Sequence, residues 1–66
     1  MKGEELREIR LQRKYTQKQL GEQLGYKGKM AERIIQSWEY NERRIPVTRF
    51  RELSRILDIP LEKFIP

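Results

Sequence analysis

The chain has 66 residues, 36% of them hydrophobic, which is enough apolar material for one small domain with a single modest core. Its 15 lysines and arginines against 10 acidic residues give a formal net charge of +5, which suits a polyanionic partner but also simple solubility. Cysteine and histidine are absent, which excludes disulfides, thiolate metal sites and the commonest general base. No apolar run is long enough to span a membrane, so we expect one cytoplasmic domain over 1–66 without a metal or cofactor.

The first two helices are predicted from apolar spacing and from residues typical of helix ends. The first begins near Gly3 and groups on one face Leu6, Ile9, Arg10 and Arg13. Thr16 is a suitable N-cap for the second helix, and Gly25 is a natural residue to end it. The small Gly21 lies between Leu20 and Leu24 on the inner face, which suggests a close approach of another helix there.

The third helix is predicted at about Met30 to Tyr40. Its buried stripe has the spacing i, i+3, i+4, i+7 and consists of Ala31, Ile34, Ile35 and Trp38. The opposite side is polar and carries Lys29, Arg33, Gln36, Ser37 and Tyr40. Asn41 follows as a residue that tolerates a left-handed conformation at the helix end.

Pro46 suits the first turn of a fourth helix, whose predicted core-facing residues are Val47, Phe50, Leu53, Ile56 and Leu57. A last short turn from Leu61 to Ile65 would close the core. There is no strand signal, so the predicted fold class is all-α with five helices.

These residues resemble the helix-turn-helix domains of the Xre family, which includes phage repressors and Cro-like proteins. The likeness covers nearly the whole chain and is carried by Leu6-Arg7-Glu8-Ile9-Arg10, Thr16-Gln17-x-x-Leu20, Gly21, Gly25, Ile35 and Trp38-Glu39. It implies a compact five-helix bundle with a central helix-turn-helix, in which the third helix reads the major groove of double-stranded DNA. A single unit covers only a few base pairs, so we expect a homodimer on DNA.

The chain departs from the family pattern at four places. Between Gly25 and Ile35 it has about four residues more than usual, nearly one helical turn, so 26–30 either extends the recognition helix or forms a longer turn with Gly28 as its pivot. Lys14 and Asn41 stand where the family often has glycine, and the segment between Glu39 and Pro46 is one residue longer.

The resemblance and the chemistry of the side chains together give the candidate DNA contacts. Gln17 is expected to contact the phosphate backbone and to brace the recognition helix, and Thr16 to contact a phosphate. Arg33 is expected to read guanine and Gln36 adenine, flanked by Glu32 and Ser37. Glu32 either accepts from cytosine or, as we slightly favour, pairs with a neighbouring lysine. The remaining candidates are phosphate contacts at Lys27, Lys29, Asn41, Arg43 and Arg44.

Two further expectations concern structure rather than DNA contact. The family often joins the positions of Arg10 and Glu39 by a salt bridge beneath the recognition helix, and we expect this pair to be structural. Three apolar residues near the end are candidates for the dimer contact, namely Leu61, Phe64 and Ile65, although Leu61 is better explained as part of the monomer core.

The leading interpretation is a sequence-specific DNA-binding transcriptional regulator, and we expect it to be a repressor. The alternative is an antitoxin-like or other protein-interaction module of the same fold; a disordered tail would favour it, and none follows Pro66 in this sequence. An enzyme is not expected, because no histidine, cysteine, phosphate-binding glycine loop or close carboxylate pair is available.

Overall fold

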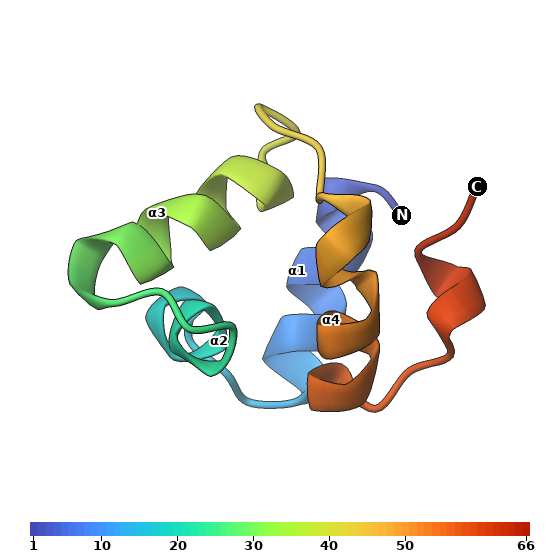
Figure 1. Ribbon diagram of the computed structural model, residues 1–66, viewed down its shortest axis with the longest axis horizontal. Coiled ribbons are helices and arrows are strands. Elements are labelled where there is room, and N and C mark those ends of the chain that lie inside the picture. The colour runs from blue at the N-terminus through green and yellow to red at the C-terminus, as the bar shows by residue number, and fades with distance from the viewer.

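The computed structural model describes residues 1–66 and contains four α-helices and two short 3₁₀ turns, with no strand. The helices are α1 (Gly3–Gln12), α2 (Gln17–Gln23), α3 (Gly28–Glu39) and α4 (Phe50–Leu57), and the turns are η1 (Val47–Arg49) and η2 (Leu61–Lys63). Figure 1 shows α2 and α3 together at one end of the molecule and η2 at the other. The all-α prediction is confirmed, and no helix has the length and apolar character to cross a membrane.

The predicted number of helices was wrong by one. The segment after Pro60 forms a 3₁₀ turn, as short terminal pieces often do, instead of a fifth α-helix. Its function in the fold is still the expected one, because Phe64 follows it and is only 2% exposed. The Phe64 ring stacks on Phe50 with their centroids 5.4 Å apart, which closes the core beside α4.

The core consists of apolar side chains that all four helices and the last turn contribute. Its buried members are Leu6, Leu20, Leu24, Ile35, Trp38, Leu53, Leu57 and Phe64. Each helix contributes residues at the spacing the sequence predicts, so these elements form because packing buries one stripe of each. Val47 is the exception: it is 75% exposed, contrary to the prediction that it faces the core. The 3₁₀ turn that precedes α4 changes the phase of the chain, so Val47 does not continue the stripe of Phe50.

Every helix ends with a residue in the left-handed region. These are Lys14, Gly25, Asn41 and Asp58, with φ values of 63°, 96°, 59° and 54°. After α2, the Gly25 amide donates to Glu22 and the Tyr26 amide donates to Gly21, which is the two-bond pattern of a Schellman motif. The same pattern ends α1 and α3 at non-glycine residues, so Lys14 and Asn41 adopt the conformation that glycine would adopt more easily.

Candidate nucleic-acid interface

The α2–α3 pair is held at a very close crossing. A Cβ atom added at Gly21 would overlap the backbone of Ala31, including its carbonyl oxygen, so only glycine permits this approach. Ala31 is itself fully buried. The prediction that Gly21 marks a tight helix contact is confirmed, and the crossing sets the direction in which the outer face of α3 points.

The start of α3 shows whether residues 26–30 extend the helix or lengthen the turn before it. The helix begins at Gly28, two residues earlier than the predicted Met30, and Lys27 is its N-cap residue. Both alternatives are therefore partly correct: Tyr26 and Lys27 lie in the loop between α2 and α3, while 28–30 extend α3 at its start. Gly28 has a φ of +59°, which a residue with a side chain rarely adopts.

The N-terminus of α2 is tied to the end of α3. Thr16 caps α2 by accepting from the Gln19 amide at 3.0 Å, and the Gln19 side chain accepts from the Thr16 amide in return. The Gln17 amide group donates to Glu39 Oε1 at 3.1 Å. Gln17 thus contacts the recognition helix, and its expected phosphate contact stays a prediction.

Glu39 also forms a buried ion pair with Arg10. The Arg10 Nε and Nη2 atoms donate to Glu39 Oε2 and Oε1 at 2.5 and 3.1 Å, and Nη1 donates to the Tyr15 carbonyl at 2.8 Å. The side chains of Arg10 and Glu39 are 7% and 1% exposed. The carboxylate therefore receives three bonds, two from Arg10 and one from Gln17, and the network joins α1, α2 and α3 beneath the outer face of α3.

The outer face of α3 carries polar side chains that the rest of the chain does not engage. Lys29, Glu32 and Arg33 are exposed, and no ion pair or side-chain hydrogen bond within the chain involves them. The favoured pairing of Glu32 with a neighbouring lysine is therefore wrong. Gln36 and Ser37 are half-buried, and the Ser37 hydroxyl donates to the Ile34 carbonyl at 2.7 Å.

Arg49 holds the α2–α3 turn in place through contacts that the sequence did not indicate. The guanidinium of Arg49 lies 4.8 Å from the ring centre of Tyr26, and its Nη1 donates to the Leu24 carbonyl at 3.2 Å and to Glu52 at 2.8 Å. The hydrogen bond to Glu52, followed by the one to Tyr26, raises the pKa of Arg49, so this cation stays charged. Arg49 lies more than 20 positions along the chain from this turn, so no local pattern could reveal the contact.

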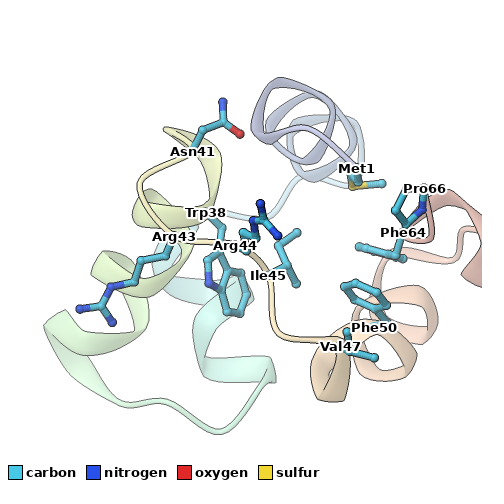
Figure 2. Close-up of a pocket in the computed structure, with 10 residues that line it drawn as sticks. All are labelled: Met1, Trp38, Asn41, Arg43, Arg44, Ile45, Val47, Phe50, Phe64 and Pro66. Carbon is cyan, nitrogen blue, oxygen red and sulfur yellow. The ribbon is translucent and has the colours of Figure 1, made fainter.

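The three DNA contacts predicted in the loop after α3 differ in whether their side chains are already bonded within the protein. The Asn41 side chain is already engaged by α1, since Oδ1 accepts from the Gly3 amide at 3.0 Å and Nδ2 donates to Glu4 at 3.1 Å. Arg43 and Arg44 are exposed and make no ion pair. Both also line an open groove of about 610 Å³. Figure 2 shows the Arg43 side chain directed away from Phe50 and Phe64, whose rings line the same groove.

A short helix packed across a second helix, with the outer face of the second left polar and unpaired, defines a helix-turn-helix DNA-binding domain. The comparison with protein families agrees: a model described as Helix-turn-helix matches residues 6–64. The chain belongs to this family, in its Cro and phage-repressor (Xre) branch. The comparisons with curated proteins and with solved structures found no match.

Proposed function

We propose that this protein is a sequence-specific regulator of transcription that binds double-stranded DNA in the cytoplasm, as a homodimer, and represses the genes it binds. The main support is the outer face of α3, where Lys29, Glu32 and Arg33 are exposed without an internal partner. Free polar side chains on a helix that is held rigidly from behind are suited to reading base edges in the major groove.

In this proposal, each element has a separate task. Arg33 and Gln36 read bases, and Glu32 and Ser37 lie beside them on the same helix. Thr16 and Gln17 place the N-terminus of α2 against a phosphate, and further phosphate contacts come from Lys27, Lys29, Arg43 and Arg44. The side chain of Asn41 bonds to Gly3 and Glu4 of α1 and is still exposed, so its predicted phosphate contact would use its second Nδ2 hydrogen or its backbone.

A dimer is expected because one α3 helix spans only part of a groove, and two half-sites one helical turn apart give a longer recognition sequence. Of the three apolar candidates for the contact, Phe64 is excluded because it is 2% exposed within the monomer core. Ile65 remains the best candidate at 55% exposure.

Selection of bound sequences from a random DNA pool tests the proposal, followed by affinity measurements for selected and random duplexes. We expect a palindromic or paired half-site and a preference of about 10³-fold or more at physiological salt. Arg33→Ala should weaken binding by about 1–3 kcal/mol and relax the preference at one base position, whereas Lys29→Ala should weaken all sequences alike and lower the salt dependence.

Equal affinity for selected and random DNA would contradict the regulator proposal. Repression is tested by placing the selected site over a promoter: transcription should fall when the protein is present and recover when Arg33 is replaced. A rise in transcription with the site in the same position would favour activation instead.

A further inference from the structure

Met30 is an apolar side chain in an unexpected place. It is 60% exposed on the first turn of α3, although the next residue, Ala31, is fully buried against α2. The contact between Ala31 and Gly21 fixes this turn, so Met30 is directed outward by a rigid backbone. Figure 1 shows the start of α3 at the end of the molecule farthest from η2, with α2 beneath it.

Met30 shares the outer face of α3 with the residues proposed to contact DNA. Arg33 and Ser37 follow it at i+3 and i+7, the spacing that places side chains in one row along a helix. Met30 and Arg33 are separated by about 4.5 Å along the helix axis, and neighbouring base pairs of a duplex are about 3.4 Å apart. The two side chains can therefore reach base pairs that are one or two steps apart.

The charges around Met30 favour a duplex over an apolar partner. Lys27, Lys29 and Arg33 are all exposed and unpaired, and Glu32 is the single acidic residue among them. A protein surface that buries Met30 would have to accommodate these cations, whereas a DNA groove has phosphates along both sides. Within the groove the C5 methyl group of thymine is the apolar feature that distinguishes a base pair.

We propose, on the basis of the proposed function, that Met30 contacts the C5 methyl group of a thymine one or two base pairs from the guanine that Arg33 reads. The first turn of α3 then adds an apolar contact to the polar contacts made further along the helix. Met30 is in this way a determinant of specificity and not of general affinity for DNA.

The test uses the full chain and the half-site obtained by selection. Each thymine of the site is replaced in turn by deoxyuridine, which removes only the methyl group, and the Kd is measured by fluorescence anisotropy. We expect one position at which the replacement weakens wild-type binding about fourfold, as for the loss of one buried methyl group. That effect should disappear in Met30→Ala and persist in Met30→Leu, which keeps an apolar side chain of similar size.

Leu11→Ala is the matched control, because it removes an exposed apolar side chain (53% exposed) from α1 and should leave the deoxyuridine effect unchanged. Thermal unfolding should show that all three variants remain folded. If wild type selects a site but no thymine position responds differently in Met30→Ala, the inference about Met30 is overturned and the proposed regulator stands. If wild type selects no site, both proposals fail.

Discussion

The buried network around Glu39 gives the sharpest prediction about stability. The Glu39 side chain is 1% exposed and accepts three hydrogen bonds, two of them from Arg10. Arg10→Met would leave the buried carboxylate with Gln17 as its only donor. An uncompensated buried charge of this kind costs about 3–5 kcal/mol. Since a chain of this length has a total stability of about 3–10 kcal/mol, this one substitution should bring the domain close to unfolding.

Removing the negative charge of Glu39 should lower the stability less than removing Arg10 does. In Glu39→Gln the side chain stays similar in shape, its oxygen can still accept from Arg10, and the Arg10 guanidinium keeps its bond to the Tyr15 carbonyl. The double variant has no buried charge to compensate, so its loss should be smaller than the sum of the two single losses. We expect a coupling of about 2 kcal/mol or more between the two positions.

Urea denaturation of the four proteins of this cycle measures the coupling, with fluorescence of Trp38 as the probe. Trp38 lies in the core and is only 2% exposed, so unfolding should change its emission. If the two single losses add to within about 0.5 kcal/mol, Arg10 and Glu39 do not stabilise the fold as a pair, and the reasoning is wrong.

Three further predictions concern the backbone and the turn. Gly21→Ala should destabilise the domain by about 1–3 kcal/mol, measured by thermal unfolding, because the added Cβ overlaps the backbone of Ala31. Lys14→Gly should raise the stability in the same measurement by about 1 kcal/mol, because glycine adopts the left-handed conformation without strain. Asn41→Gly should not raise it, because this change also removes two hydrogen bonds to α1, and a gain in both variants would contradict the reasoning. Arg49→Met should speed hydrogen exchange in the α2–α3 turn more than in α1. Because the pKa of Arg49 is raised, its stabilising effect is present at all pH values below the unfolded-state pKa of arginine and is lost only as the pH rises through the folded-state pKa.

The sequence was a good guide wherever a structural feature depends on near neighbours. Thr16 caps α2 through a residue three positions away, Gly25 ends the same helix, and the apolar stripe of α3 follows helical spacing. Each of these depends on backbone geometry within a few residues. Even the departures at Lys14 and Asn41 were located correctly, because the left-handed conformation is required by the local end of a helix.

The contacts that could not be predicted join distant parts of the chain. The Arg13 Nε atom donates to the Leu57 carbonyl at 2.6 Å, so the residue directly after α1 caps the end of α4. Gly3 resembles an ordinary first residue of a helix, yet a Cβ added there would overlap the carbonyl of Glu39. Such contacts follow from how the helices pack, and a long polar side chain such as Arg13 has many possible partners before packing is known.

These distant contacts make the fold and the DNA specificity separable. The start of α3 is held by the contact of Ala31 with Gly21 and the end by Glu39 with Arg10, and all of these lie behind or beside the outer face. The side chains expected to read DNA take no part in either support. Substitutions at Met30 or Arg33 should therefore change which sequence is bound while leaving thermal unfolding nearly unchanged, since exposed positions outside such features rarely alter stability by more than about 0.5 kcal/mol. Substitutions at the supports should lower stability first and reduce binding to all sequences together.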